Sequence, residues 1–417
     1  MTGRAGPAPS GRRAPVRDAV IAGIAAAVMC GAGAWPCGST APSAHAAESP
    51  VIRVGILVDR PSVDIGADGP VTVEDVSLSM YAAPVPAALP PRAAAAAWIA
   101  TASATGGLDL SGVALGPAVR ITARRGLLRA DGRPYRGVLE LRRTVAAHVT
   151  VVNVVDLESY LYGVIKGEME PSWPREAVRA QAVAARTLAV ERMLAAHPPV
   201  PGLAGAGAGF DVPATTDAQV YLGAAAEDPA ATAAVDATRG LVAAYDGRPI
   251  FAAYHANSGG HTDDSENVWG RPYPYLRGVP DPYALEAPGV SWSAVVPLGT
   301  IETDLRRGGI DLAGLVDLAA GRVTTWGRVL TVIVREESGR TQEINANRFR
   351  LLVGPAVLRS TMLSLARRDR EVAFAGRGSG HGVGLDQWGA RAMAARGFTY
   401  EQILKYYYTG VMIEPRY

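Results

Sequence analysis

The chain has 417 residues, of which 48% are hydrophobic and 6% aromatic, and it contains 47 Gly and 30 Pro. This length is enough for one large domain or two ordinary ones, and the Gly/Pro share predicts a globular protein rich in loops. The formal net charge is +2, but residues 1–46 carry four Arg and one Asp, so the remainder holds 37 basic and 38 acidic residues and a net charge of −1. A near-neutral chain gives no electrostatic basis for binding nucleic acid.

The N-terminal segment predicts an export signal. Basic residues precede an uncharged apolar run at 19–29, and a stretch of small residues with the sequence AHA at 44–46 follows. These features are typical of a secretory signal peptide over residues 1–46, so we expect an exported protein, in the cell wall, the periplasm or the medium. If it stayed uncleaved, the same segment would act as a membrane anchor, although it is short for a span. Cys30 and Cys37 both lie in it, so the mature chain is expected to have no disulfide, thiol nucleophile or thiolate ligand.

From residue 51 to 155 the sequence is predominantly strand-like. The β-branched run 51–58 predicts a strand, and several runs between 113 and 155 predict further strands, with Asp131-Gly132 as a hairpin turn. Residues 81–98 are rich in Ala and Pro and predict a linker or surface insertion.

Helical spacing begins after residue 156. A short helix is predicted over 157–164, followed by a break at 167–171 and a second helix with Pro174 in its first turn and its end at Leu194. The later expectations are a helix at 228–238, a strand at 250–254, a polar helix early in 301–370, a strand at 328–335, a helix or turn at 347–352, a glycine-rich loop at 376–384, and helices at 386–396 and 400–407.

The first candidate for chemistry is Glu168, which lies in the break with Tyr160, Tyr162 and Trp173 nearby in sequence. Aromatic rings supply stacking faces for sugars, and a partly desolvated Glu has a raised pKa suited to general acid catalysis. A solvated loop residue or a helix cap also explains Glu168, so the residues alone leave both readings open.

Two polar residues stand out on the Ala-rich second helix. Gln181 and Arg186 need hydrogen-bond partners if that helix is buried. They would either tie the helix to the loop that holds Glu168 or orient Glu168 and its ligand.

The segment YHANSGGHT at 254–262 places His255, Ser258 and His261 around a Gly-Gly pair, which predicts a loop where backbone approaches a ligand. A serine hydrolase would pair Ser258 with a histidine, but the G-x-S-x-G elbow is missing. Metal binding by His255 and His261 is a second alternative, although their six-residue gap without Cys is not a standard ligand spacing. A histidine satisfied within the loop is the simplest reading.

The glycine-rich segment GRGSGHGVGLDQWGA surrounds His381 with glycines, and Gln387 and Trp388 follow it. It lacks the Lys-Ser/Thr and the glycine spacing of a phosphate-binding loop. The glycines would hold His381 exposed, with Trp388 a helical turn or so beyond, while a purely structural turn is the alternative.

Five segments, taken in order, resemble the stage II sporulation protein D (SpoIID/LytB) family. The resemblance runs from about Arg133 to Gly410, with a weaker match at the first strand. The segments read VVNVVDLESYLYGVIKGEMEPSWPREAVRAQAVAARTLAV, TTDAQVYLG, AYHANSGGHTDDSENVWGRPYPYLRGVPDPY, FRLLVGPAVLRSTML and GRGSGHGVGLDQWGARAMAARGFTYEQILKYYYTG.

This resemblance implies an α+β fold of mixed strands and helices, with a SpoIID-like catalytic core and loop-rich insertions. The expected parts are a signal peptide at 1–46, an N-terminal strand region with the Ala/Pro-rich insertion at 47–130, and the catalytic domain at 131–417. The implied activity is that of a peptidoglycan lytic transglycosylase acting on glycan strands freed of stem peptides, with Glu168 as the catalytic acid.

The same resemblance implies residues that contact the substrate. They are Gln181, Arg186, Ser258, His381 and Gln387, and we expect His255 and Trp388 in the same segments to contact the substrate as well. No cofactor or metal is expected, because the cysteines that some family members carry in the segment at 211–219, where they contribute to a zinc site, are absent here. Ser379 stands where the family often has Trp, which would weaken a stacking contact.

A single carboxylate suits this chemistry, because a lytic transglycosylase uses the C6 hydroxyl of its own substrate as nucleophile, whereas a hydrolase normally needs two carboxylates. Glu158 and Glu170 are the nearest rivals of Glu168. The alternative function is a non-catalytic amidase enhancer or glycan-binding protein of the cell wall. The expected partners are peptidoglycan glycan strands and, on that alternative, a cell-wall amidase.

Overall fold

The computed structural model describes residues 49–76, 86–87, 97–194, 209–216 and 218–417. The expected signal peptide and most of the expected Ala/Pro-rich insertion therefore lie outside the described residues. The expected α+β fold is confirmed by strands and helices that alternate irregularly along the chain. Within the part that is described, no helix is both long and apolar enough to cross a membrane.

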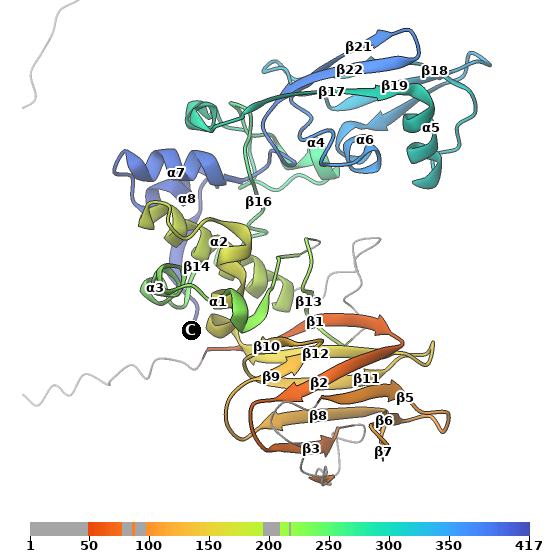
Figure 1. Cartoon of the computed structure of the whole chain (residues 1–417). Coiled ribbons are helices and arrows are strands. Elements are labelled where there is room, and N and C mark those ends of the chain that lie inside the picture. Colours follow the sequence, from red (N-terminus) through yellow and green to blue (C-terminus); the bar gives the residue numbers. More distant parts are fainter. Residues whose placement is uncertain (1–48, 77–85, 88–96, 195–208, 217) are drawn as a thin grey trace, which may run out of the picture. The chain divides into compact units, whose positions relative to one another are not determined.

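Two sheets, antiparallel except for one strand pair, form the N-terminal region (Figure 1). The larger has the order β13-β1-β12-β11-β8-β3-β4, with β13 parallel to β1, and the smaller has the order β10-β9-β2-β5-β6-β7. Their strands are β1 (Val51–Arg60), β2 (Ser62–Ala67), β3 (Val71–Asp75), β4 (Pro86–Ala87), β5 (Trp98–Ala102), β6 (Leu108–Leu110), β7 (Val113–Leu115), β8 (Ala118–Ala123), β9 (Leu128–Ala130), β10 (Arg133–Tyr135), β11 (Val138–Arg143), β12 (Val149–Asp156) and β13 (Val212–Pro213).

The predicted hairpin turn is confirmed between β9 and β10, where Asp131 and Gly132 have φ values of 46° and 77°. Two consecutive positive φ angles are what a two-residue hairpin turn requires. The expected boundary between the N-terminal region and the catalytic domain, at residues 130 and 131, falls within this turn.

The helices form a second layer around α2 (Arg175–Leu194), which packs against α1 (Leu157–Glu168), α3 (Pro229–Ala237), α7 (Gln387–Ala395) and α8 (Tyr400–Tyr407). Many of its buried residues are Ala, and small side chains let neighbouring helices approach closely. Short elements connect this layer: η1 (Gly223–Ala226), β14 (Leu241–Tyr245), β15 (Arg248–Pro249), β16 (Tyr254–His255), α4 (Ser265–Trp269), η2 (Pro282–Glu286), β23 (Leu385–Asp386) and β24 (Met412–Pro415).

Residues 291–377 form an inserted subdomain with its own hydrophobic core. It has two three-stranded sheets, with the orders β17-β22-β21 and β18-β19-β20. Its elements are β17 (Ser291–Pro297), α5 (Leu298–Arg307), β18 (Leu315–Ala320), β19 (Thr331–Glu336), β20 (Thr341–Asn345), α6 (Ala346–Val353), β21 (Leu363–Arg368) and β22 (Glu371–Arg377). The polar helix, the strand and the short helix predicted here correspond to α5, β19 and α6.

Two predictions of local structure were wrong in extent. The break expected at 167–171 begins only after Glu168, because α1 continues for another turn to Glu168, with Met169 as its C-cap. The strand expected at 250–254 is reduced to the two residues of β16, because Ile250 is held by a backbone hydrogen bond to Ala243 and only Tyr254 and His255 pair with β23.

Candidate functional site

Glu168 is the last residue of α1, and its side chain is half-buried. Its Oε1 accepts a hydrogen bond of 2.7 Å from the backbone N–H of Val220, and the Tyr254 hydroxyl donates to the same carboxylate. Burial raises the pKa of Glu168, and the two donors only partly oppose that shift. Both donors are neutral, so the proton on this carboxyl is retained to higher pH than on an exposed Glu.

A chain of side-chain hydrogen bonds fixes the direction of the Tyr254 hydroxyl. The amide nitrogen of Gln219 donates to the Tyr254 oxygen at 3.2 Å, while the amide oxygen of Gln219 accepts from Tyr160 at 3.1 Å. Because the Tyr254 oxygen receives this hydrogen bond, its own single O–H is left for Glu168. The carboxylate therefore faces a donor that the protein has oriented in advance.

Gln387 joins the N-terminus of α7 to the end of α1. Its Nε2 donates to the carbonyl oxygen of Glu168 at 2.9 Å and to the Oε1 of Gln181 at 3.3 Å. The first of these bonds satisfies one of the carbonyls that a helix leaves unpaired at its C-terminus. Glu168, Gln181 and Gln387, all singled out from the sequence, thus lie together at the end of α1.

Trp388 follows Gln387 and pairs with Trp173, with ring centroids 4.7 Å apart and an interplanar angle of 54°. The guanidinium of Arg391 lies 5.6 Å from the Trp173 ring centre and 5.2 Å from that of Trp388. Both rings are half-buried, so part of each aromatic surface is accessible. Partly accessible indole faces of this kind suit contact with a sugar ring.

Ser258 is fully buried and lies against a pair of carboxyl groups. Its Oγ donates to Asp281 at 2.9 Å, and its backbone N–H donates to Asp386 at 2.6 Å. Burial and the adjacent Asp281 raise the pKa of Asp386 well above the ordinary range. The Ser258 hydroxyl is therefore used within the core and has no exposed surface for a glycan in this structure.

The two histidines of the same loop do not activate Ser258. The Nδ1 of His255 bonds the carbonyl of Val383 at 3.1 Å, and that of His261 bonds the carbonyl of Thr262 at 2.6 Å. The arrangement therefore lacks the nucleophile–base hydrogen bond of a serine hydrolase.

His255 and His381 lie 5.4 Å apart between ring centroids. Burial lowers the pKa of both, that of His381 to about 3, so both rings are neutral at ordinary pH. The His381 ring bonds the backbone carbonyl of Tyr254, and thereby supports the residue whose hydroxyl reaches Glu168. Across the described ranges, no group of three or more His, Cys, Asp or Glu side chains could hold a metal ion.

Arg186 is not brought to Glu168. It is fully buried and forms two hydrogen bonds with Glu158, of 2.8 and 2.7 Å. Glu158 lies in the first turn of α1, ten residues before Glu168, which places it about 15 Å away along the helix. Among the rival carboxylates, Glu158 is thus committed to an ion pair and Glu170 is exposed.

Tyr254 and Gln219 were missed as site residues. Both lie in segments that carry the family resemblance, TTDAQVYLG and AYHANSGG, but each looks like an ordinary core residue in the sequence. Val220 contributes only its backbone N–H, which no side-chain pattern reveals.

Comparison with known proteins gives matches over much of this region. The family described as stage II sporulation protein matches residues 146–245, which include Glu168, Gln181 and Gln219. A Bacillus subtilis protein named stage II sporulation protein D is 31% identical over 271 residues, covering 63% of this chain and 75% of that protein. An uncharacterized protein of Brachyspira hyodysenteriae is 36% identical over 263 residues, covering 63% of this chain and 68% of its own. A Bacillus subtilis protein named amidase enhancer is 30% identical over 302 residues, which are 61% of this chain but 40% of that protein.

Proposed function

Because this chain belongs to the stage II sporulation protein D family, we propose that it acts outside the cytoplasm on the cell wall, as a lytic transglycosylase that cleaves peptidoglycan glycan strands. The observation that carries the proposal is the environment of Glu168, a half-buried carboxyl with a raised pKa and only neutral hydrogen-bond donors. A carboxyl of this kind can hold a proton for a leaving group and take one back.

In the proposed reaction, Glu168 donates its proton to the glycosidic oxygen as the bond to the sugar C1 breaks. The C6 hydroxyl oxygen of the same muramyl residue then bonds to C1, and its proton passes to the Glu168 carboxylate. The products are a strand with a new hydroxyl and a 1,6-anhydro-muramyl end, and the enzyme recovers its starting protonation state. Tyr254 and the Val220 N–H stabilise the carboxylate during the interval in which it is charged.

The surroundings of Glu168 favour this route over hydrolysis. Hydrolysis by either stereochemical course normally uses a second carboxylate that flanks the bond being cleaved. Of the two rivals nearest in sequence, Glu158 is paired with Arg186 and Glu170 is exposed. A substrate that supplies its own nucleophile needs no second carboxylate.

The test compares wild type with Glu168→Gln on glycan strands freed of peptides, with anhydro-muramyl ends measured by mass spectrometry. Loss of a general acid is expected to lower the rate by about 100-fold or more. Glu170→Gln is the matched control, since it removes a neighbouring exposed carboxylate and should leave the rate near that of wild type. Equal rates for both variants, or no anhydro ends from wild type, would contradict the proposal.

A second candidate function follows from the relative named amidase enhancer. On this reading the chain binds glycan strands and stimulates a cell-wall amidase without cutting the glycan itself. Release of stem peptides by an amidase, measured with and without this protein, distinguishes the two functions. Stimulation that Glu168→Gln retains in full, together with no anhydro ends, would favour the enhancer.

A further inference from the structure

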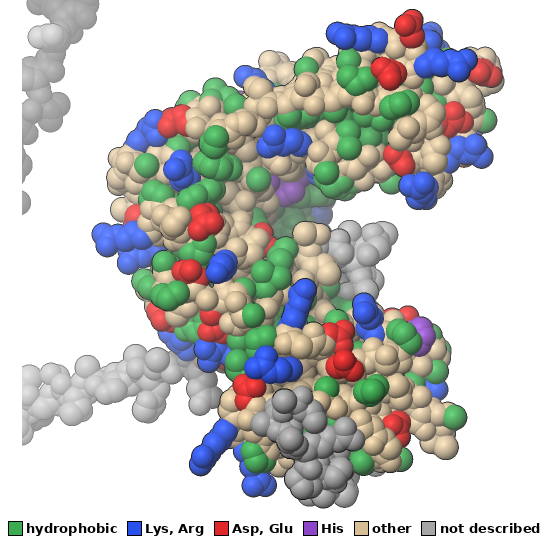
Figure 2. Space-filling model, in the orientation of Figure 1, with side chains coloured by type: hydrophobic (Ala, Val, Ile, Leu, Met, Phe, Trp, Pro, Cys, Tyr) green, Lys and Arg blue, Asp and Glu red, His purple; other side chains and the backbone are tan. Residues whose placement is uncertain are grey.

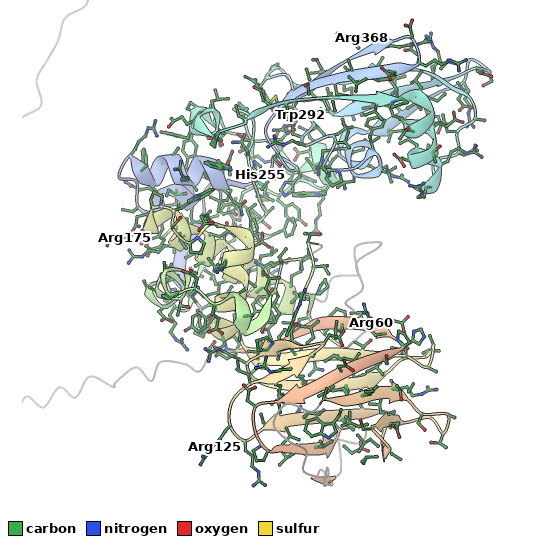
Figure 3. The ribbon with its side chains drawn as sticks, in the orientation of Figure 1. Arg60, Arg125, Arg175, His255, Trp292 and Arg368 are labelled. Atoms are coloured by element: carbon green, nitrogen blue, oxygen red, sulfur yellow. The ribbon has the colours of Figure 1, made fainter. Side chains whose placement is uncertain are left out.

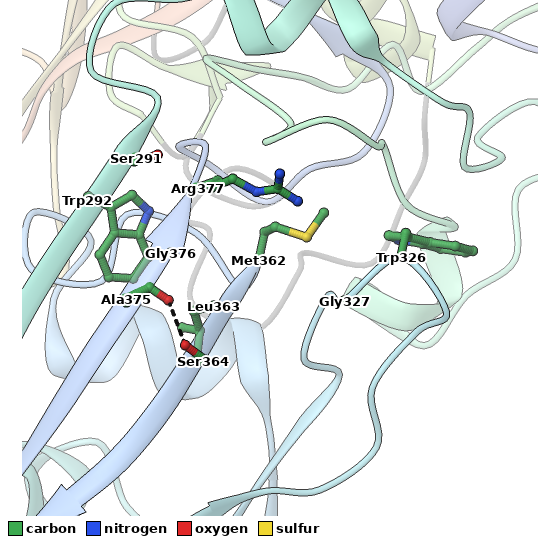
Figure 4. A pocket seen from close by; sticks show the side chains of 10 residues that line it. All are labelled: Ser291, Trp292, Trp326, Gly327, Met362, Leu363, Ser364, Ala375, Gly376 and Arg377. Atoms are coloured by element: carbon green, nitrogen blue, oxygen red, sulfur yellow. Dashed lines mark hydrogen bonds between the residues drawn. The ribbon is translucent and has the colours of Figure 1, made fainter.

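A pocket of 430 Å³ opens on the inserted subdomain, outside the residues that surround Glu168 (Figure 4). Trp292 and Trp326 are part of its lining, and Met362 and Arg377 lie between these two indoles. Its volume is within the range of about 300–1,000 Å³ that is usual for sites of small ligands. The pocket is therefore large enough for a sugar residue, and its lining has the aromatic rings that such a residue would contact.

The two tryptophans are held in place by specific contacts. Trp292 on β17 pairs across the sheet with Gly376 on β22, where a Cβ atom would lie only 2.4 Å from the indole. Trp326 stacks on His261 at 4.2 Å between ring centroids, with an interplanar angle of 11°. The nitrogens of both indoles are buried, so the pocket presents ring surface rather than N–H donors.

Arg377 gives the pocket its charge. It is exposed, no acidic side chain lines the pocket, and no ion pair of Arg377 occurs among the residues that the structure describes. An apolar, aromatic pocket with a single unpaired cation is complementary to a ligand with a flat apolar face and a carboxylate.

The pocket is tied to the loop that carries Ser258. The buried Arg328, two residues after Trp326, donates to the carbonyls of Ser258 and His261 at 2.7 and 3.0 Å. Two residues after Arg377, Ser379 forms a β-bridge with Asn257. Two residues that lie within two positions of the pocket lining, Arg328 and Ser379, are thus bonded to the loop that follows Tyr254.

We infer that this pocket is a second glycan subsite, which binds a muramyl residue through its free lactyl carboxylate at Arg377 and through the indole faces. The identity of the sugar rests on the proposed function, because removal of the stem peptide is what exposes this carboxylate. The subsite thus selects glycan strands that have lost their peptides.

The experiment measures binding rather than cleavage. Peptide-free glycan oligosaccharides, and the same oligosaccharides with their carboxylates converted to methylamides, are titrated calorimetrically into the full chain carrying Glu168→Gln. Adding Arg377→Gln should weaken binding of the charged glycan about tenfold, because one charge-assisted contact is lost. Binding of the amidated glycan should be unchanged. Trp326→Ala should weaken binding of both.

Arg368→Gln is the matched control, since it removes the same charge from the same subdomain. Arg368 lies at the opposite end of β21 from Leu363, which lines the pocket. Figure 3 shows Arg368 well away from Trp292, which also lines the pocket. The inference is overturned if Arg377→Gln binds both glycans like Arg368→Gln, or if the charged and amidated glycans bind the parent protein equally. Cleavage by wild type is scored separately by its anhydro ends. A failure of the subsite is therefore distinguishable from a failure of the proposed activity.

Discussion

The two ends of α1 carry carboxylates in opposite environments. Glu158 in the first turn is fully buried and is bonded by the guanidinium of Arg186, by the backbone N–H of Gly240 and by the Tyr417 hydroxyl. Glu168 at the last residue is half-buried and receives only neutral donors. A cation fixes the first carboxylate as a structural anion, whereas burial without a cation leaves the second able to exchange a proton.

Charged side chains on the surface are in a third kind of environment, different from those of Glu158 and Glu168. Figure 2 shows basic and acidic side chains interspersed over the visible face, as expected for a chain whose residues 47–417 are close to neutral in net charge. Ion pairs in such positions are screened by water and contribute little to stability. The contrast between the two ends of α1 therefore depends on burial as well as on the presence of a cation.

The largest effect is expected from removing the ion pair between Arg186 and Glu158, at the N-terminal end of α1. Arg186→Met leaves Glu158 buried without its cation, which should lower the free energy of unfolding by about 3–5 kcal/mol. The control is Arg179→Met on the same helix, because Arg179 forms a partly exposed pair with Glu176 at 2.7 Å. That change should cost at most about 1 kcal/mol. Denaturant unfolding measures both, and equal costs would show that the buried pair is not a structural anchor.

The next effect concerns the pKa of Glu168, at the C-terminal end of α1. Tyr254→Phe removes a donor that stabilises the charged form of Glu168, so the pKa of Glu168 should rise further. Because the reaction starts from protonated Glu168, the alkaline limb of the dependence of kcat/KM on pH should move to higher pH. Tyr408→Phe is the control, since the Tyr408 hydroxyl is buried nearby but donates to the carbonyl of Ala253 at 2.8 Å. Coincident alkaline limbs for the two variants would exclude Tyr254 from tuning Glu168.

Local structure was largely predictable from the sequence. The helix α8 has the predicted limits, because a Thr399–Gln402 capping box begins it and the apolar spacing continues to Tyr407. The limits of α2 were also close, since Pro174 favours a helix start and the Ala/Val spacing is helical. Signals of this kind lie within a few residues of the structure that they determine.

Contacts between residues far apart in the chain were harder to predict from the sequence. Gln181 and Arg186 are five residues apart on α2, so their side chains point about 140° apart around the helix axis. One reaches Gln387 beside Glu168, and the other reaches Glu158 at the opposite end of α1. The sequence shows that both are unusual on an Ala-rich helix, but only the packing of α1 determines which of them lies near Glu168.

The smallest expected effect is on the stability of Glu168→Gln. A glutamine side chain keeps an oxygen that can accept from Val220, so the free energy of unfolding should change by less than about 1 kcal/mol. The sign should depend on pH, because the raised pKa of folded Glu168 favours its protonated form. In wild type this contribution is fully present below the unfolded pKa of about 4.3 and is lost as the pH rises through the folded value. Glutamine does not titrate, so the variant should gain stability relative to wild type between acid and neutral pH. Unfolding by urea at both ends of that interval measures the difference, and a relative loss on going to neutral pH would mean that Glu168 is held as a stabilised anion, like Glu158.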